Sequence, residues 1–250
     1  MSEIAISVRD LTKSYTDGAG AATRGCEHVS FDAYYGEAFG LLGTNGAGKT
    51  TILRVLSTVL RPTSGEAIIA GHSVLDAPES VRASIGFLSA STGVYGRLSA
   101  REMIHYFGRL HGLTNPEVAL RIEELTGALD MRDYLDRRCE KLSSGQKQRV
   151  NIARTIIHDP EVLILDEATT GLDILAAKQI IRFIKEYRGR GRCIILSTHI
   201  MHEAEQLCDR VLIIHDGVVR SGGTLTDLRK EFHTNSLDEV FLKSIGEEVI

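Results

Sequence analysis

The chain has 250 residues, of which 43% are hydrophobic and 25% are charged, a composition that argues against a largely disordered protein. Its 29 basic and 33 acidic residues give a net charge of −4, so it lacks the basic excess that is typical of nucleic-acid-binding proteins. The four cysteines are too widely spaced for a zinc-site pattern, and no segment resembles a secretory signal or a membrane span. We therefore expect a cytosolic chain that reaches a membrane only through a partner.

Short apolar runs predict the strands of an α/β fold. The first five lie at residues 4–8, 29–34, 38–42, 66–70 and 85–88. Three more lie at residues 162–165, 193–196 and 211–214. These three and the run at 85–88 are almost continuously apolar, which is typical of parallel strands that are covered on both faces. The sequence HDG at residues 215–217 is a candidate hairpin turn.

The middle of the chain differs, because three segments with helical spacing follow one another without a convincing strand between them. They lie at residues 101–113, 116–129 and 143–158. We therefore predict one domain over residues 1–250 whose α/β core is interrupted by a helical insertion. Its parts are a core at residues 1–89 and 160–223, a helical subdomain at 90–159 and a helical tail at 224–250.

A glycine-rich loop follows the strand predicted at residues 38–42. The sequence GTNGAGKT matches the phosphate-binding pattern G-x-x-x-x-G-K-T in its expected context, after a strand and before a helix. Glycines allow backbone N–H groups to approach phosphates, and a helix N-terminus adds positive potential. The Lys49 ammonium would reach the β- and γ-phosphates, and the Thr50 hydroxyl would bind Mg²⁺. Against a chance match in a glycine-rich loop, we predict a nucleotide site at Gly43, Thr44, Asn45, Gly46, Ala47, Gly48, Lys49, Thr50 and Thr51.

An acidic pair follows the apolar run VLIL. A carboxylate at the end of a buried strand holds Mg²⁺ in P-loop enzymes, and we predict this role for Asp166. The adjacent Glu167 would act as general base on the attacking water. The alternative is that the pair only caps the helix that follows, because acidic residues favour helix N-termini. The phosphate-binding loop upstream favours the magnesium site.

Five motifs in a fixed order resemble those of ABC-transporter ATP-binding subunits. They are the phosphate-binding loop, LSSGQKQR at residues 142–149, VLILDE at 162–167, ATTGLD at 168–173 and STH at 197–199. Tyr15, in LTKSY, also falls where this family places an aromatic residue that stacks on adenine. The resemblance covers nearly the whole chain. It implies a P-loop NTPase core with a mixed sheet and flanking helices, an antiparallel β subdomain and an inserted α-helical subdomain.

The resemblance also implies roles for residues outside the loop and the acidic pair. In this family the signature residues of one subunit face the ATP of the opposite subunit, so two copies would clasp the nucleotide between them. His199 would contact the γ-phosphate and hold Glu167 and the water in place, and Asp173 would lie at the dimer seam. The residues implied for the nucleotide site are therefore also Tyr15, Ser143, Ser144, Gly145, Gln146 and Asp173.

Three of these residues have a simpler interpretation when they are taken alone. Tyr15 is also consistent with a half-buried strand residue, because tyrosine is common in strands. Ser143 is also consistent with an ordinary helix N-cap, and His199 with a structural histidine.

The chain departs from the family pattern at two positions. Where the family usually has a glutamine that touches Mg²⁺ and the attacking water, this chain has Ala90, which offers no polar atom, although Ser89 or Ser91 could substitute. The signature is LSSGQ instead of LSGGQ, and Ser144 is tolerable if its φ is negative. We therefore expect slow ATP hydrolysis by the isolated subunit.

The segments at residues 93–113 and 235–246 resemble ATP-binding subunits of ABC-2-type exporters, especially sodium-extruding (NatA-like) subunits and their drug-exporting relatives. This likeness implies an ATPase that uses ATP and Mg²⁺ to power export of Na⁺ or a drug. Its partners would be a separate ABC-2-type membrane permease and a second copy of the ATP-binding subunit, with no nucleic acid. The permease would hold the chain at the cytoplasmic face of the cell membrane.

Other functions stay open. A soluble ABC ATPase could act on a non-membrane partner such as the ribosome, although the chain has a single signature and an acidic balance. A P-loop GTPase or small-molecule kinase would leave the signature unexplained, and no N-K-x-D motif is present. Ala90 suggests a non-hydrolysing regulatory subunit, but the intact Lys49, Asp166, Glu167 and His199 argue against it.

Overall fold

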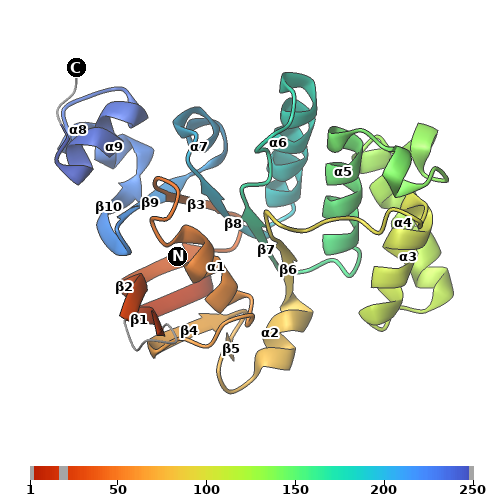
Figure 1. The fold of residues 1–250 in the computed structure, drawn as a ribbon, viewed down its shortest axis with the longest axis horizontal. Coiled ribbons are helices and arrows are strands. Elements are labelled where there is room, and N and C mark those ends of the chain that lie inside the picture. Colours follow the sequence, from red (N-terminus) through yellow and green to blue (C-terminus); the bar gives the residue numbers. More distant parts are fainter. Residues whose placement is uncertain (1–2, 17–21, 248–250) are drawn as a thin grey trace.

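A six-stranded sheet forms the centre of the structure, a computed structural model that describes residues 3–16 and 22–247 (Figure 1). Its strand order is β10-β9-β3-β8-β7-β6. All neighbouring pairs are parallel except β9 and β10, which form an antiparallel hairpin. The bounds are Ala38–Leu42 for β3, Ile85–Leu88 for β6, Val162–Asp166 for β7, Cys193–Thr198 for β8, Arg210–His215 for β9 and Val218–Thr224 for β10.

A second sheet has four antiparallel strands in the order β2-β1-β4-β5. The bounds are Ile4–Thr16 for β1, Ala22–Tyr34 for β2, Ser64–Ile69 for β4 and His72–Ser73 for β5. The two sheets with their helices confirm the predicted α/β class with a mixed core sheet and an antiparallel β subdomain.

The central sheet is covered on both faces, as its continuous apolar runs predict. Alternate residues of each strand point to opposite faces, so Leu163 and Leu165 join one apolar cluster while Val162 and Ile164 join the other. The antiparallel sheet, α1 (Lys49–Leu56) and α2 (Pro78–Ser84) lie on one face. Helices α6 (Ile174–Gly189) and α7 (Met201–Leu207) lie on the other (Figure 1).

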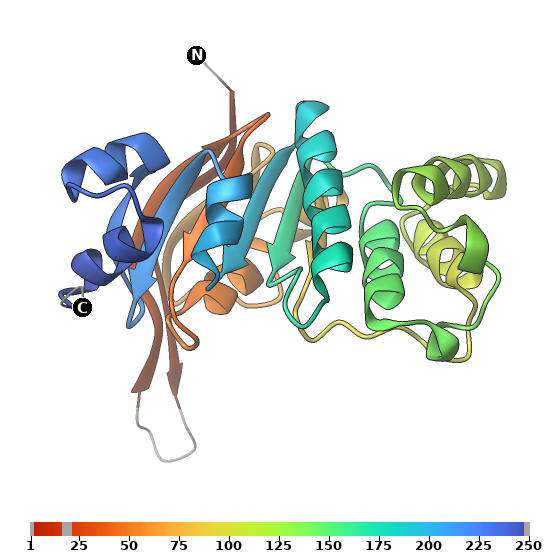
Figure 2. The same ribbon diagram turned by 90° about the horizontal axis from the view of Figure 1, so that it is seen from above.

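A helical segment extends from one end of the central sheet (Figure 2). It contains α3 (Ala100–Leu110), α4 (Asn115–Ala128) and α5 (Ser144–Thr155). Each of these helices begins with a capping box, in which an N-cap hydroxyl and the side chain three residues later exchange hydrogen bonds with backbone N–H groups. The apolar side chains of this segment share one cluster with a face of the sheet, so the segment is anchored to the core.

The tail contains two helices at the opposite end of the sheet (Figure 2), namely α8 (Leu225–Glu231) and α9 (Leu237–Ile245). The last part of the predicted tail, residues 248–250, lies outside the described residues. In the part of the chain that the structure describes, no helix is long and apolar enough to cross a membrane.

The structure differs from the predicted elements mainly in the antiparallel sheet. β1 and β2 have 13 residues each, whereas the apolar runs predict strands at residues 4–8 and 29–34. Their outer halves are polar and are held by pairing with each other, with register shifts around Asp10, whose φ is 52°. The strands β5 and β10 and the helices α2, α6 and α7 are additional elements, although the predicted hairpin turn at residues 215–217 directly precedes β10.

Candidate active site

The carboxyl ends of three neighbouring parallel strands bring together the chemically active motifs. In the register of the sheet, Leu42 of β3 pairs with Thr198 of β8, and Ser197 of β8 pairs with Asp166 of β7. The glycine-rich loop, the acidic pair and His199 therefore leave the sheet at the same edge. This edge is where open α/β sheets bind their ligands.

The glycine-rich loop ends in a tight turn that opens helix α1. Gly48 is the N-cap of α1, with φ 106°, and no side chain caps this helix start. A Cβ at Gly48 would lie 2.3 Å from the carbonyl oxygen of Gly25, so the loop is seated directly on β2. The backbone N–H groups at the start of α1 are consequently left open to a ligand, in the manner of an anion site.

The Lys49 side chain folds back along the loop. It is 4% exposed, and its Nζ donates hydrogen bonds to the carbonyl oxygens of Gly43 at 2.7 Å and Thr44 at 3.0 Å. Burial lowers the pKa of the Lys49 ammonium, while the carboxylates of Glu167 and Asp166 oppose this effect. The ammonium is thus held at the loop without a direct ion pair among the described residues.

Asp166 is the centre of a small polar cluster at the end of β7. The residue is only 1% exposed. Its Oδ1 accepts hydrogen bonds from the Ser197 hydroxyl at 2.6 Å and the Thr50 hydroxyl at 3.1 Å. The other oxygen, Oδ2, is buried and has no hydrogen-bond partner among the described residues. A buried carboxylate oxygen without a partner beside a threonine hydroxyl fits the oxygen ligands that Mg²⁺ takes.

No group of three or more His, Cys, Asp or Glu side chains in the described part of the chain could hold a metal by itself.

Glu167 has a backbone conformation that is rare for its residue type. Its φ is 51°, in the left-handed region, and its backbone N–H donates to the Ser197 carbonyl oxygen at 3.2 Å. The Glu167 carboxylate lies 3.1 Å from Nδ1 of His199. Because an ionised carboxylate only accepts hydrogen bonds, Nδ1–H donates in this contact and leaves Nε2 directed elsewhere. The structure therefore brings together the two residues for which a catalytic role is predicted.

The end of the phosphate-binding loop, the start of α1 and Glu167 line one cavity of about 240 Å³, whereas Asp166 and His199 are not among its lining residues. Tyr15 of β1 forms one wall, and its hydroxyl lies 3.1 Å from the Thr51 hydroxyl. Tyr15 is thus both a strand residue and a residue of the cavity. The remaining lining residues are Thr23, Arg24, Gly25, Asn45, Gly46, Ala47, Gly48, Lys49, Thr50 and Glu167.

The signature residues do not line this cavity. Ser143 is the N-cap of α5, and its hydroxyl and the Gln146 side chain complete the capping box of that helix. Ser144 is exposed and begins the helix outside the left-handed region, so its Cβ causes no backbone strain. At Gly145 a Cβ would lie 2.7 Å from the Ala176 Cβ, which explains a glycine at this position.

Asp173 lies beside the signature helix at the start of α6. Its carboxylate accepts a hydrogen bond from the backbone N–H of Ala176 at 2.9 Å, so it is the N-cap of α6. A direct link connects the signature helix with the residue that follows the acidic pair, because the Gln148 amide donates to the carbonyl oxygen of Ala168 at 2.6 Å.

Ala90 is exposed and follows strand β6 at the same edge of the sheet. Leu88 of β6 pairs with Leu165 of β7, so the turn after β6 runs beside the acidic pair. The hydroxyls of Ser89 and Ser91 lie 3.2 Å apart and contact each other.

Several residues of the site escape analysis of the sequence. The most important is Ser197, which bonds to Asp166 through its hydroxyl and to the Glu167 backbone through its carbonyl oxygen. Its place in the STH motif, two residues before His199, is the available signal. No motif contains the cavity residues Thr23, Arg24 and Gly25. They reach the loop because β2 pairs with β1.

Comparison with known proteins agrees with this geometry. A model of the ABC transporter family matches residues 26–170. The ABC transporter ATP-binding protein NatA of Bacillus subtilis strain 168 is 38% identical over 241 residues, which cover 96% of this chain and 98% of that protein. The daunorubicin resistance ATP-binding protein DrrA3 of Streptomyces coeruleorubidus is 34% identical over 247 residues, which cover 99% of this chain and 76% of that protein.

A solved structure of an ATP-binding subunit of an ABC transporter shares the fold. Its TM-score is 0.86 at 31% sequence identity, over 96% of this chain and 99% of that chain.

Proposed function

The chain belongs to the ABC transporter family as an ATP-binding subunit with ATPase activity, and from this premise we propose that it powers export through an ABC-2-type membrane permease. The observation that carries the catalytic part is the buried Asp166 carboxylate, with one oxygen bonded to Thr50 and Ser197 and the other without a partner. It lies at the end of a strand that neighbours the phosphate-binding loop, where a nucleotide and its metal ion would meet.

In this proposal the loop binds the triphosphate from one side. The open N–H groups at the start of α1 and the Lys49 ammonium contact the β- and γ-phosphates, and Tyr15 stacks on the adenine. Thr50 and Asp166 are the residues that would hold Mg²⁺, and the ion would supply positive charge against the developing negative charge of the triphosphate.

Glu167 then acts as the general base. Its carboxylate accepts a proton from the water that attacks the γ-phosphate, because it lines the cavity beside the phosphate-binding loop. His199 fixes the carboxylate through the Nδ1 contact of 3.1 Å, which leaves its Nε2 available for the γ-phosphate. Ser197 is a positioning residue, since it holds both Asp166 and the backbone of Glu167.

The second side of the triphosphate comes from another copy of the chain. Ser143 and Ser144 are exposed and do not line the cavity of their own subunit, so they are free to meet the ATP of a partner. The N-terminus of α5 contributes positive potential for the γ-phosphate, and Asp173 lies beside it for contact across the seam.

We further propose that residues 90–159 act as the helical subdomain that contacts the permease, with residues 1–89 and 160–223 as the core and 224–250 as the tail. The permease would hold the chain at the cytoplasmic face of the membrane. The name of the relative DrrA3 refers to daunorubicin resistance, which supports a drug or, by the family likeness, Na⁺ as the exported substrate.

The Glu167→Gln variant tests this function. We expect it to retain ATP binding but to hydrolyse ATP about 10²- to 10⁴-fold more slowly, because a general base contributes that much. With ATP it should elute as a dimer in size-exclusion chromatography, and without ATP as a monomer. A monomer at saturating ATP would contradict the shared site, and unchanged hydrolysis would contradict the assignment of the base.

A further inference from the structure

The two proposed catalytic residues lie on separate turns of the chain. Glu167 begins the turn after β7, and His199 begins the turn after β8. Their side chains meet at 3.1 Å, although no stretch of sequence connects the two turns directly. The Glu167 backbone has a φ of 51°, and a residue of this type keeps such a conformation only when its surroundings hold it. The position of one turn relative to the other therefore decides whether the contact forms.

Glu203 of α7 bonds to both turns at once. Its Oε1 accepts a hydrogen bond from the hydroxyl of Thr169, two residues after Glu167. Its Oε2 accepts a hydrogen bond at 3.0 Å from the hydroxyl of Thr198, which directly precedes His199. One carboxylate thus spans the two turns that carry the proposed catalytic side chains.

Both threonines are removed from solvent. Thr169 is 6% exposed and Thr198 is 2% exposed, so their hydroxyls depend on an acceptor within the protein. The Thr198 hydroxyl also accepts the backbone N–H of Ile200 at 3.0 Å, so the residues on both sides of His199 are fixed. Because a buried hydroxyl without an acceptor is costly, the loss of the Glu203 carboxylate would free both turns to move.

Helix α7 fixes the place of this carboxylate. Three apolar side chains of the helix are buried in the core, namely Met201, Ala204 and Leu207. Glu203 itself is partly buried, and its two oxygens bond to the threonine hydroxyls. Its neighbour Glu205 differs, because it forms an ion pair with Arg229 of α8 at 2.7 Å. The two glutamates of one short helix therefore face different parts of the molecule.

We propose that Glu203 is a positioning residue of the ATPase site, which keeps Glu167 and His199 in contact by bonding to the turn that carries each of them. The proposal rests on the proposed function for the roles of Glu167 and His199 in hydrolysis. Glu203 does not line the nucleotide cavity, so it acts on the reaction through the two turns. Its loss should lower kcat and leave the affinity for ATP unchanged, because the phosphate-binding loop lies on another segment.

ATP hydrolysis and ATP binding by the full-length chain test this split. Glu203→Ala should lower kcat about ten- to a hundredfold, because the catalytic pair is displaced, and should leave the Kd for ATP within about twofold. Glu203→Gln should retain more activity than Glu203→Ala, since the amide oxygen still accepts a hydrogen bond from one hydroxyl. The matched control Glu205→Ala, on the same helix, should change kcat less than about twofold. Unchanged kcat in Glu203→Ala, or an equal loss in Glu205→Ala, would overturn the proposal.

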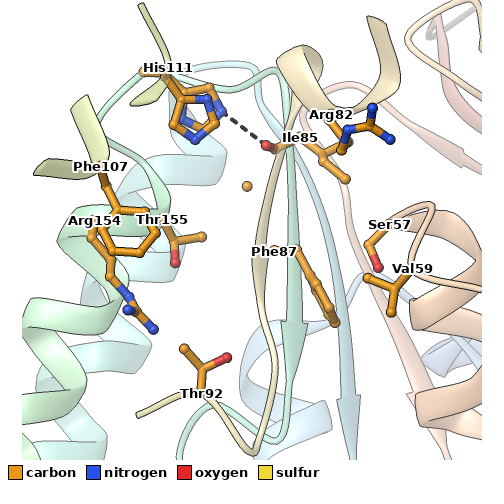
Figure 3. Close-up of a pocket in the computed structure, with 12 residues that line it drawn as sticks. Ser57, Val59, Arg82, Ile85, Phe87, Thr92, Phe107, His111, Arg154 and Thr155 are labelled. Atoms are coloured by element: carbon orange, nitrogen blue, oxygen red, sulfur yellow. Dashed lines mark hydrogen bonds between the residues drawn. The ribbon is translucent and has the colours of Figure 1, made fainter. Parts of the chain in front are cut away.

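The threonines test the route by which Glu203 acts. Thr169→Val and Thr198→Val each remove a hydroxyl and should each lower kcat. Adding Glu203→Ala to this pair should cost less than about a further twofold, because the three residues act as one unit. The control is Thr155→Val, which removes a buried hydroxyl from the cavity of about 380 Å³ between α5 and the edge strand β6 (Figure 3). This control should leave kcat within about twofold, and full additivity of the other three changes would contradict the route.

NMR of the histidine ring nitrogens gives a readout that does not depend on hydrolysis. In the wild type, the His199 proton should lie on Nδ1, because this nitrogen donates to Glu167. In Glu203→Ala we expect the His199 signals to move toward those of a ring free in water. The signals of His202, which lies on the same helix as Glu203, should stay in place. Unchanged His199 signals in the folded variant would contradict the positioning role, even if kcat falls.

Glu167→Gln separates this proposal from the function on which it rests. Hydrolysis at the wild-type rate by Glu167→Gln would remove the general base, and the His199 signals would then decide on Glu203 alone. Slow hydrolysis by Glu167→Gln together with full activity of Glu203→Ala would leave the function intact and overturn the positioning role. Should Glu203→Ala not fold, Glu203→Gln and the two threonine variants provide the same comparison.

Discussion

Two helix starts in this chain have opposite chemistry, although both are proposed to bind the same triphosphate. Helix α1 begins at Gly48, has no side-chain cap and is locked onto β2 by a close backbone contact. Helix α5 begins at Ser143, where a capping box satisfies the N–H groups of Ser143 and Gln146. The start of α1 has no side-chain cap, whereas the start of α5 is partly closed by its own side chains.

The two helix starts therefore differ in what they need in order to bind a phosphate. The loop before α1 gathers a lysine, open N–H groups and the Asp166 cluster within one chain, so it can bind a nucleotide without help. Helices α3 and α4 begin with capping boxes of the same kind as that of α5, and neither has a predicted ligand. The capping box alone therefore does not mark a binding site, and α5 needs a partner that brings the phosphate to it.

The largest expected effect contrasts two lysines, one at each helix start. Lys49→Met should weaken ATP binding to the isolated chain at least about a hundredfold, because charge-assisted contacts to two phosphates are lost. Lys147→Met, in the first turn of α5, should change it less than about threefold. Fluorescent-nucleotide titration measures both. Equal effects of the two variants would remove the distinction between the open and the closed start.

The second prediction concerns the other end of the signature helix, where His158 follows α5. Burial, with His111 as the next cause, lowers the pKa of His158 from 6.5 to about 4. The unfolded chain therefore binds a proton that the folded chain resists, and stability is lost as the pH falls from 6.5 toward 4. The loss should reach about 2 kcal/mol after allowance for partial exposure.

The check is urea unfolding of wild type and His158→Gln at pH 7 and pH 4.5. The difference in unfolding free energy between the two proteins should shift with pH in favour of the variant, which carries no titrating ring. A constant difference over this range would show that His158 is not held neutral by the fold.

The smallest expected effect compares two capping boxes. Ser143→Ala and Ser99→Ala should each lower the free energy of unfolding by about 1 kcal/mol, because each removes an N-cap hydrogen bond. Only Ser143→Ala should also weaken the ATP-driven dimer, by about tenfold in the Glu167→Gln background, since only this hydroxyl meets a phosphate. Sizing at a series of protein concentrations measures this, and equal dimerisation of the two variants would count against a special role for Ser143.

The sequence was sufficient for the parts of the site that are contiguous in the chain. GTNGAGKT directly follows a strand and VLILDE ends one, so the sequence alone predicts that Lys49, Asp166 and Glu167 lie at the edge of the sheet. The central strands were also predictable, because each is apolar along its whole length.

The remainder depends on contacts between distant segments. Gly25 supports the loop only because β2 pairs with β1 beneath it, and the polar outer halves of these strands carry no strong pattern. Arg154 lies in the signature helix and looks like an ordinary surface residue of a helix. Its burial against Phe107, and the absence of an acid nearby among the described residues, became visible only when α3 and α5 were seen around the edge strand β6.

The central claim, that one ATP is held by Lys49 of one copy and Ser143 of another, is tested most directly by mixing two inactive variants. Lys49→Met keeps an intact start of α5, and Ser143→Arg keeps an intact phosphate-binding loop. A dimer of either variant with itself therefore contains no complete site. A mixture should regain ATP hydrolysis, up to about a quarter of the wild-type rate, because half of its dimers contain one intact site of two. A mixture no more active than the sum of the separate variants would contradict the account.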